Sequence, residues 1–376
     1  MYKFYIENKA FTVPKDFSKL DEFIVNSIPQ EYNITIKNDS DIFKEVQKLL
    51  DENKGNIVLI DEKVYNIYFK KLNIEKSRLF LAKATEKFKT LKGVEDVVVF
   101  LEKNEFTKSE KLIVIGGGII EDVGAFVGAC YKRGIKWIYY PTTLLSMCDS
   151  CIGGKTGINY NNVKNQLALF SSPYEVRINL AFLTTLSEYD IKSGIGEVLK
   201  LLITGGKDLL NIYLKKVQIG KVKRLEGYRF LILASLSVKK AVVEEDEFEL
   251  YYRKSLNYGH TIGHAVEVLS DYKIPHGQAV IIGIIIVNKL FQKRGVLNNE
   301  DYNLIKKLSI EVLGEDFTLK NIPLNGLDKL LKKDKKTEGS IINFVAISSL
   351  GNTKFLKLEL SESLIQEIGL IITQEF

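Results

Sequence analysis

Residues 111–122 read KLIVIGGGIIED, in which the apolar run Leu112–Ile115 ends directly in three glycines, Gly116–Gly118. Continuous apolar runs of this kind predict strands that are buried on both faces, as in a parallel sheet. Glycines at the end of such a strand let backbone N–H groups approach a phosphate, and a helix that follows points its positive end at the same anion. The segment is not a G-x-G-x-x-G fingerprint, so a tight strand–helix turn is the alternative interpretation.

Strand and helix patterns alternate on both sides of this segment. After a short N-terminal hairpin, they predict a charged helix near Asp41–Asn53, strands at Asn56–Val64 and Ser77–Leu81, a helix at Leu91–Asn104 and a strand at Lys136–Leu145. This alternation favours a parallel α/β sheet over roughly the first 175 residues.

Beyond Pro173 the pattern becomes mainly helical. Amphipathic segments are expected at Asp190–Ile203, Tyr228–Glu245, Thr261–Leu269 and Glu300–Leu313, with one late strand at Ile342–Ser348. The absence of a Pro/Ser-rich linker predicts two closely packed domains, which we place at residues 1–178 and 179–376.

Composition narrows the class of protein. The 53 Lys and Arg are interleaved with 47 Asp and Glu, so no block of like charge indicates a nucleic-acid partner. The longest apolar stretch, Ala279–Val287, is far shorter than the roughly 18–20 residues that span a bilayer. The start MYKFYIENK has no apolar signal region, so we expect a cytoplasmic protein. Cys148 and Cys151 form a lone CxxC, which we interpret as buried thiols because no second pair accompanies it.

The three histidines of the chain, His260, His264 and His276, fall within one short window. Residues four apart share a helix face, so His260 and His264 are able to meet one metal or one substrate. Three clustered histidines favour a metal or catalytic site over ordinary core positions. A carboxylate from elsewhere is the expected fourth group, and Glu197 is the best candidate because apolar residues surround it in sequence.

A second polar cluster occupies Asp149–Gly157 (DSCIGGKTG) and is followed by Lys164-Asn165. Gly, Lys, Thr and Asn side by side are typical of a loop around an oxyanion, and apolar sequence flanks this one.

Taken together, these motifs resemble those of the 3-dehydroquinate synthase family, within the wider sugar-phosphate cyclases. The resemblance runs from about Asn56 to Ser348, whereas residues 1–55 are atypical. Its motifs are the glycine turn with Asp122, Arg133-Gly134, PTTLL at Pro141–Leu145, DSxxGGKTGxN at Asp149–Asn159, Lys164-Asn165, SGxxExxK at Ser193–Lys200, LNxGHTxGHAxE at Leu256–Glu267, His276-Gly277 and DKK at Asp334–Lys336.

The resemblance implies a Rossmann-like, parallel-sheet NAD-binding domain followed by a mainly helical domain that binds metal and substrate. The cofactors implied are NAD and one divalent metal, zinc or cobalt. The reaction implied converts 3-deoxy-D-arabino-heptulosonate 7-phosphate to 3-dehydroquinate and phosphate through transient oxidation by NAD, elimination, reduction and an intramolecular aldol step. A homodimer is also implied.

The same resemblance implies roles for individual residues. The implied metal ligands are Glu197, His260 and His276, which leaves His264 for acid–base or hydrogen-bonding work. The NAD site would comprise Asp61, Glu86, Lys89, Gly117, Gly118, Asp122, Thr142, Thr143, Asp149, Lys155, Lys164, Phe182 and Thr185. The phosphate would contact Lys155, Asn165, His264 and Arg133, the last across a dimer interface. The carboxylate end of the substrate would contact Lys240, Arg253, Asn257 and either Lys335 or Lys336. The ring hydroxyls would contact Asp149 and Lys200.

Several positions depart from the family pattern. Glu121 stands where the family commonly has Gly, so either its carboxylate points to solvent or dinucleotide binding is altered. Cys151, Gln166, Asp190 and Gln278 also depart from the usual residues. These changes loosen the substrate assignment and keep open another sugar-phosphate cyclase, for example one that acts on sedoheptulose 7-phosphate. A metal-dependent NAD polyol dehydrogenase is a second alternative, because enzymes of the glycerol-dehydrogenase type share the two-domain architecture. A catalytically silent metal-binding protein is disfavoured by the presence of Lys155, Asn165, Arg253 and His264.

Overall fold

The glycine-rich segment joins a buried strand to a helix, because β7 (Lys111–Gly116) runs into α4 (Gly118–Cys130). In the computed structural model the chain divides into two compact units. We call Lys19–Leu186 the sheet unit, and Met1–Ser18 together with Ser187–Phe376 the helical unit. The structure describes residues 1–38, 41–72, 74–161, 163–216, 225–314, 316–319, 326–333 and 337–376.

A seven-stranded sheet in the order β3-β4-β11-β8-β7-β5-β6 forms the core of the sheet unit. Its other strands are β3 (Glu22–Val25), β4 (Tyr32–Lys37), β5 (Ile57–Asp61), β6 (Leu79–Ala82), β8 (Lys136–Pro141) and β11 (Glu175–Asn179). Neighbouring strands are parallel except β3 with β4. The parallel α/β sheet expected from the sequence is therefore confirmed, with Leu112–Ile115 fully buried in the interior strand β7.

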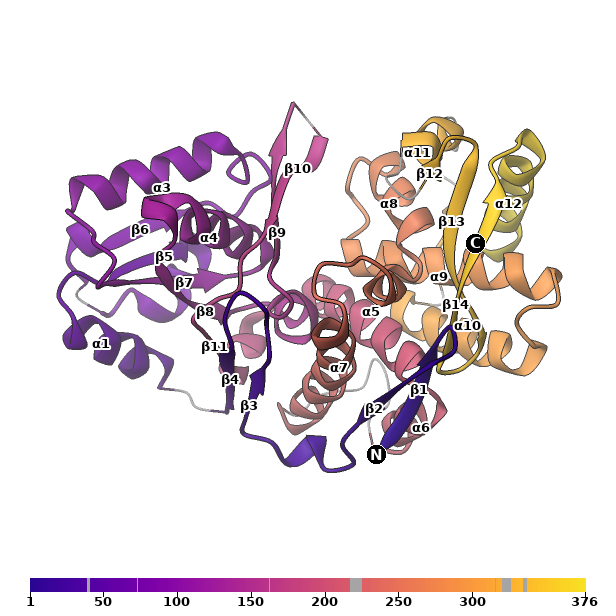
Figure 1. Ribbon diagram of the computed structural model, residues 1–376, viewed down its shortest axis with the longest axis horizontal. Coiled ribbons are helices and arrows are strands. Elements are labelled where there is room, and N and C mark those ends of the chain that lie inside the picture. The colour runs from indigo at the N-terminus through magenta and orange to yellow at the C-terminus, as the bar shows by residue number, and fades with distance from the viewer. Residues whose placement is uncertain are drawn as a thin grey trace. The chain divides into compact units, whose positions relative to one another are not determined.

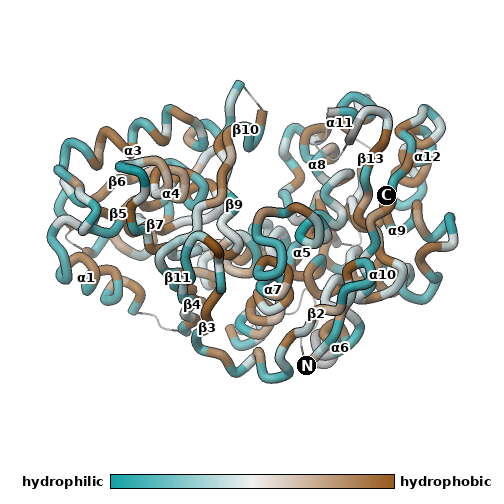
Figure 2. The backbone as a smooth tube through the Cα atoms, in the orientation of Figure 1, coloured by the Kyte–Doolittle hydropathy of each residue, from teal (hydrophilic) through white to brown (hydrophobic). Residues whose placement is uncertain are grey.

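Helices cover both faces of this sheet, with α3 (Leu91–Lys103) and α4 on one side and α1 (Ile42–Glu52) on the other (Figure 1). Hydrophilic and hydrophobic residues alternate along α1 and α3 (Figure 2), as amphipathic helices require. Helix α4 packs directly on the strand before it: a Cβ at Gly124 would lie 2.7 Å from the side chain of Val114. The glycines of α4 thus fix the glycine turn against the sheet.

The part of the predicted oxyanion cluster from Lys155 onward lies in an antiparallel hairpin, β9 (Lys155–Tyr160) and β10 (Val163–Phe170). Its register shifts between Val163 and Leu167, so the ladder is irregular around Lys164 and Asn165. Strand β10 begins with the consecutive polar residues Lys164–Gln166, so its sequence does not alternate as a half-buried strand usually does, and this explains the missed strands.

The helical unit contains α5 (Glu188–Gly205), α6 (Lys207–Lys216), α7 (Leu225–Glu245), α8 (His260–Leu269), α9 (His276–Lys293), α10 (Asn299–Leu313), α11 (Leu327–Lys333) and α12 (Glu362–Glu375). Its five-stranded sheet has the order β12-β13-β14-β1-β2. The strands are β1 (Tyr2–Ile6), β2 (Lys9–Val13), β12 (Thr337–Glu338), β13 (Ile341–Ser349) and β14 (Asn352–Glu359). The sequence predicted one late strand, whereas the described residues form β12, β13 and β14 in that part of the chain.

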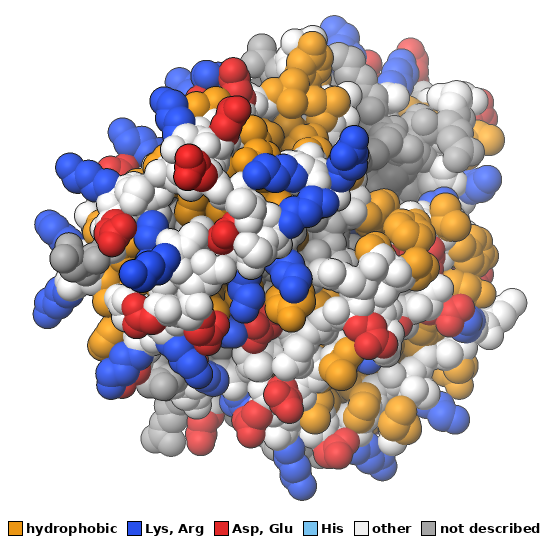
Figure 3. Space-filling model, turned by 60° about the vertical axis from the view of Figure 1, so that its left-hand side comes forward, with side chains coloured by type: hydrophobic (Ala, Val, Ile, Leu, Met, Phe, Trp, Pro, Cys, Tyr) orange, Lys and Arg blue, Asp and Glu red, His pale blue; other side chains and the backbone are white. Residues whose placement is uncertain are grey.

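The N-terminal hairpin belongs to the helical unit and corrects the predicted domain boundaries. Strand β1 pairs in parallel with β14, with Tyr5 opposite Asn352, and Figure 1 shows this indigo hairpin beside the yellow C-terminal strands. The other boundary falls between Leu186 and Ser187, after the 3₁₀ turn Leu180–Thr185, instead of at residue 178. None of the helices in the described ranges combines the length and apolar character needed to cross a membrane. On the face shown in Figure 3, basic and acidic side chains are interspersed, as they are in the sequence.

Candidate functional site

The three histidines converge in the helical unit. Ring nitrogens of His260, His264 and His276 all lie within 4.8 Å of one another. The Glu197 carboxylate lies beside two of them: its Oε1 is 3.2 Å from Nε2 of His276 and 3.7 Å from Nε2 of His260. Helices α5, α8 and α9 therefore bring one carboxylate and three imidazoles to a single point.

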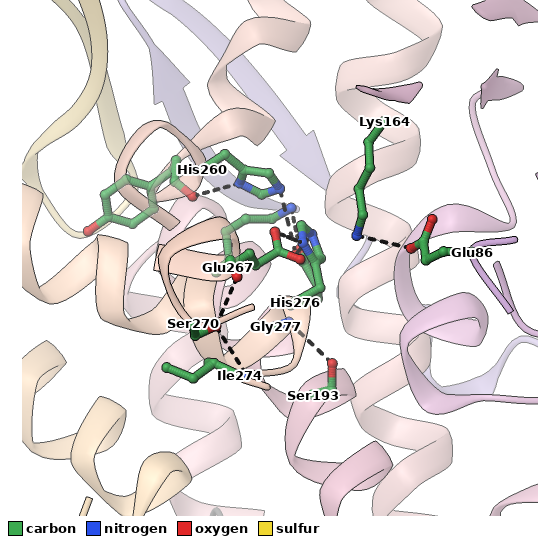
Figure 4. Close-up of polar contacts among 12 residues, drawn as sticks. Glu86, Lys164, Ser193, His260, Glu267, Ser270, Ile274, His276 and Gly277 are labelled. Carbon is green, nitrogen blue, oxygen red and sulfur yellow. Dashed lines mark hydrogen bonds and ion pairs between the residues drawn. The ribbon is translucent and has the colours of Figure 1, made fainter. Parts of the chain in front are cut away.

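Two further contacts orient these rings (Figure 4). Nδ1 of His260 lies 3.1 Å from the carbonyl oxygen of Tyr258, and Nδ1 of His276 lies 2.9 Å from Oε2 of Glu267. A carbonyl or carboxylate oxygen only accepts, so each Nδ1 donates its proton. In the neutral ring this leaves the lone pair on Nε2, on the side of Glu197. Outer hydrogen bonds of this kind are characteristic of histidines that bind metal.

Glycines allow the three helices to approach closely enough to form this cluster. A Cβ at Gly196 on α5 would overlap the carbonyl of Gly277 on α9, and a Cβ at Gly277 would overlap the carbonyl of Ser193. The N–H of Gly277 also donates to Oγ of Ser193 at 3.2 Å (Figure 4). Glu197 directly follows Gly196, and His276 directly precedes Gly277. The crossing of α5 with α9 therefore sets the separation of these two side chains.

The electrostatics of the cluster favour a cation. Glu197 is 1% exposed and forms a buried ion pair with Lys200. Burial opposes protonation of His276, but hydrogen bonds to Glu197 and Glu267 outweigh it and raise the pKa of His276 to about 10. A buried carboxylate with imidazole nitrogens on oriented rings is a donor set that suits zinc or a similar divalent metal. The residues present therefore fit the metal that the resemblance implies.

A second polar network lies in the sheet unit, around the hairpin β9–β10. Lys89 pairs with Asp122 at 2.5 Å, and the other oxygen of Asp122 accepts the N–H of Gly157 at 3.0 Å. Burial raises the pKa of the Asp122 carboxyl, against the lowering effect of Lys89. Glu86 pairs with Lys164 at 3.0 Å (Figure 4). Four of the residues expected at NAD thus contact one another in pairs.

Other residues expected at NAD follow the carboxyl ends of parallel strands, where ligands bind in open α/β sheets. Asp61 ends β5 and caps the next turn by accepting the N–H of Lys63 at 3.0 Å, and burial raises the pKa of its carboxyl. Gly117 and Gly118 follow β7, Thr142 and Thr143 follow β8, and Phe182 and Thr185 follow β11. Tyr68 contacts both Phe182 and Thr185. Its OH lies 2.7 Å from Oγ1 of Thr185, and the centre of its ring lies 5.0 Å from the centre of the Phe182 ring.

Glu121 is buried, with 7% of its surface exposed, so the interpretation that it points to solvent is wrong. Its Oε2 accepts a hydrogen bond from Oγ of Ser150 at 2.5 Å. Burial and the nearby Glu121 charge raise the pKa of Tyr139, whose OH donates to the carbonyl of Gly116 at 3.1 Å. The Glu121 carboxylate therefore lies near the hydroxyls of Tyr139 and Ser150, next to the glycine turn, and its hydrogen bond to Ser150 connects it to the residue after Asp149.

Two further predicted residues have a local ion pair or an exposed position. Lys240 pairs with Glu244 at 2.7 Å, whereas the adjacent Lys239 is 7% exposed. The role of Lys240 stays a prediction; on α7 the neighbouring Lys239 lies on the buried side together with Ser235, Leu236, Val242 and Val243. Arg133 is exposed in a turn with φ 61°.

The remaining predicted residues differ in how they are held. Arg253 is 1% exposed and donates to the carbonyl of Glu247, and Asn257 donates to Oε1 of Glu249 at 2.6 Å. Lys155 is exposed at the start of β9, and Asp149 is half-buried. Lys335 and Lys336 lie outside the described residues. Cys148 and Cys151 are buried thiols, as expected. Sequence reasoning missed Glu267, although its place three residues after His264 on one helix was a usable signal.

Comparisons with known proteins agree with this architecture. Residues 79–193 match the family model of the 3-dehydroquinate synthase N-terminal domain and residues 194–337 that of the C-terminal domain. The chain is 35% identical to the 3-dehydroquinate synthase of Pelagibacter ubique (strain HTCC1062) over 358 residues, 91% of this chain and 95% of that one. It is 33% identical to the Clostridium tetani (strain Massachusetts / E88) 3-dehydroquinate synthase, covering 83% and 84% of the two chains.

Solved structures share the fold at low identity. A 2-deoxy-scyllo-inosose synthase complexed with carbaglucose-6-phosphate, NAD+ and Co2+ superposes with a TM-score of 0.81 at 20% identity, over 94% of this chain and 99% of that one. ValA, a 2-epi-5-epi-valiolone synthase from Streptomyces hygroscopicus with NAD+ and Zn2+ bound, gives 0.73 at 20% identity, over 92% and 96%. Both family models and the extended sequence identity lead to one conclusion: the chain belongs to the 3-dehydroquinate synthase family.

Proposed function

We propose that the protein converts 3-deoxy-D-arabino-heptulosonate 7-phosphate to 3-dehydroquinate and phosphate, and that it uses NAD and a divalent metal. Family membership supports the reaction, and the cluster of Glu197, His260 and His276 is the single observation that carries the metal requirement. When bound, NAD would take up and return one hydride, and the metal would polarise neighbouring substrate hydroxyls. The net reaction is then redox-neutral.

In the helical unit, Glu197, His260 and His276 would hold the metal. Three protein ligands would leave open positions at the metal for substrate hydroxyls. His264 lies in the same cluster and would hydrogen bond to the substrate or move a proton. The Lys200 ammonium is fixed beside Glu197 by their ion pair, which suits a contact with a ring hydroxyl. Arg253 and Asn257 would bind the carboxylate end through charge-assisted hydrogen bonds.

In the sheet unit, Asp61, Glu86, Lys89 and Asp122 would contact NAD, with its diphosphate at the glycine turn Gly116–Gly118. The N-terminus of α4 offers N–H donors and a positive dipole end for that anion. Lys155 and Asn165 would bind the substrate phosphate, and the exposed Arg133 would complete that site from a partner chain of a homodimer. Sedimentation analysis tests the dimer.

A substrate panel with the purified protein, NAD and Zn²⁺ or Co²⁺ tests this proposal. We expect phosphate release from the heptulosonate phosphate and a product that a dehydratase converts to an ultraviolet-absorbing enone, without net NADH. Phosphate release from sedoheptulose 7-phosphate alone would instead identify another sugar-phosphate cyclase. Accumulation of NADH with a polyol such as glycerol would identify a dehydrogenase.

A further inference from the structure

Asn159, the last residue of the motif Asp149–Asn159, uses both ends of its side-chain amide. Its Oδ1 accepts the N–H of Asn165 at 3.1 Å, and its Nδ2 donates to Oε2 of Glu86 at 2.7 Å and to the Glu86 carbonyl at 3.3 Å. An N–H only donates and a carboxylate only accepts, so these partners fix which way the amide points. The side chain therefore links two segments that are far apart in sequence.

On one side of this link, the backbone at Asn165 departs from a regular strand. Asn165 has a left-handed φ of 54°, and the hairpin register shifts between Val163 and Leu167. Left-handed backbone at a non-glycine residue needs support from its surroundings. The Asn159 oxygen supplies this support by accepting the Asn165 N–H. Gly157 leaves room for the Asn165 side chain, because a Cβ at Gly157 would lie only 3.0 Å from the Asn165 Cβ.

On the other side, the link reaches the segment that carries Glu86 and Lys89. The Glu86 carboxylate that accepts from Asn159 also pairs with Lys164 at 3.0 Å. The Asn159 N–H donates to the carbonyl of Lys89 at 2.8 Å. Asn159 thus contacts, directly or through Glu86, all four residues Glu86, Lys89, Lys164 and Asn165.

We propose that Asn159 is a positioning residue that holds Lys164 and Asn165 in their binding geometry and ties them to the Glu86–Lys89 segment. The inference rests on the proposed function, which assigns Asn165 to the substrate phosphate and Glu86, Lys89 and Lys164 to NAD. Loss of the link then weakens phosphate binding without disturbing the metal cluster, whose ligands all lie in the helical unit.

Two substitutions separate the two ends of the link. Asn159→Ala removes the side-chain hydrogen bonds to both Asn165 and Glu86. Asn159→Asp keeps an acceptor for the Asn165 N–H but places a second carboxylate against Glu86. In the ligand-free protein, hydrogen–deuterium exchange in the peptide spanning residues 160–168 should accelerate about ten-fold in Asn159→Ala and less in Asn159→Asp. Asn161→Gly is the matched control, since it removes an exposed amide from the same hairpin.

The functional readout is the dissociation constant for inorganic phosphate, measured with and without NAD. Asn159→Ala should weaken phosphate binding about ten-fold and raise the substrate KM more than it lowers kcat, with metal content and Tm unchanged. Unchanged exchange in Asn159→Ala would overturn the proposal whatever the activity, and so would an unchanged phosphate dissociation constant. Failure of the wild-type protein to release phosphate from the heptulosonate phosphate would refute the proposed function instead, because exchange is read without turnover.

Discussion

Glu267 on α8 accepts a hydrogen bond from Nδ1 of His276 at 2.9 Å, and Nε2 of the same ring lies 3.2 Å from Oε1 of Glu197, where α9 crosses α5. The contact directs Nε2 of His276 toward Glu197 and places a second carboxylate behind the ring. A negative charge at this point makes the imidazole a better donor to a cation. We therefore expect Glu267 to support His276 as a metal ligand without binding the metal itself.

Substitution of Glu267 should therefore weaken metal binding more than it weakens the fold. We expect Glu267→Gln to raise the dissociation constant for Zn²⁺ or Co²⁺ by about 10- to 100-fold, because the charge behind the His276 ring is lost while a hydrogen-bond acceptor is kept. Competition against a chromogenic chelator measures this. Glu311→Gln is the control, since Glu311 is exposed on α10. Equal affinities in the wild-type and Glu267→Gln proteins would remove Glu267 from the metal site.

The division of labour among the histidines gives a second prediction. His276→Ala should lose bound metal and turnover together, whereas His264→Ala should keep about one metal per chain and lose at least about 100-fold in kcat, as expected for a proton-transfer group. Elemental analysis after gel filtration gives the metal content. Ring nitrogens of all three histidines lie within 4.8 Å of one another, so the stoichiometry of His264→Ala decides the matter. Loss of metal from that variant would make all three histidines ligands.

The sequence was sufficient for features that are encoded locally. The apolar run Leu112–Ile115 identified the interior strand β7, because burial on both faces leaves no polar position in it. The conflict between the Glu197 charge and its apolar neighbours identified the carboxylate that lies beside His260 and His276. Both signals are contained within a few residues.

Features that depend on distant pairing could not be obtained in this way. The pairing of Tyr5 with Asn352 joins the two ends of the chain, and no local pattern records it. The hairpin β9–β10 was missed because the consecutive polar residues Lys164–Gln166 interrupt the alternation that marks a strand. The burial of Lys239 but not of Lys240 depends on the packing face of α7, which follows from the helices around it.

The buried Glu121 carboxylate next to the glycine turn leads to a third prediction. Glu121→Gln should lower the dissociation constant for NAD about three- to ten-fold, because it removes a negative charge near the expected diphosphate while retaining an acceptor for Ser150. Calorimetric titration with NAD measures the change. Glu102→Gln, an exposed change on α3 in the same unit, should leave it unaffected. An increase in the dissociation constant would show that Glu121 supports the glycine turn more than it repels the dinucleotide.

The last prediction concerns the loop that leads to Arg253. The Asp246 carboxylate accepts backbone N–H bonds from Leu250, Tyr251 and Arg253 at 2.9, 2.8 and 2.9 Å. Burial opposes ionisation of Asp246, but these hydrogen bonds outweigh it and lower the pKa of its carboxyl below the usual value. A lowered pKa in the folded state means that the charged form stabilises the fold above the unfolded-state pKa of about 4, and that this contribution is lost as the pH falls through the folded-state value.

Asp246→Asn should accordingly reduce the free energy of unfolding by about 1 kcal/mol near pH 7, and the deficit should shrink as the pH falls below about 4. Urea unfolding of the wild-type and Asp246→Asn proteins between about pH 3 and 7 measures the difference, in which any loss of metal common to both cancels. Asp16→Asn is the control, since Asp16 is exposed. Because the same hydrogen bonds place the backbone of Arg253, the variant should also raise the substrate KM. A deficit that is constant with pH would mean that the carboxylate charge contributes nothing and that shape alone holds the loop.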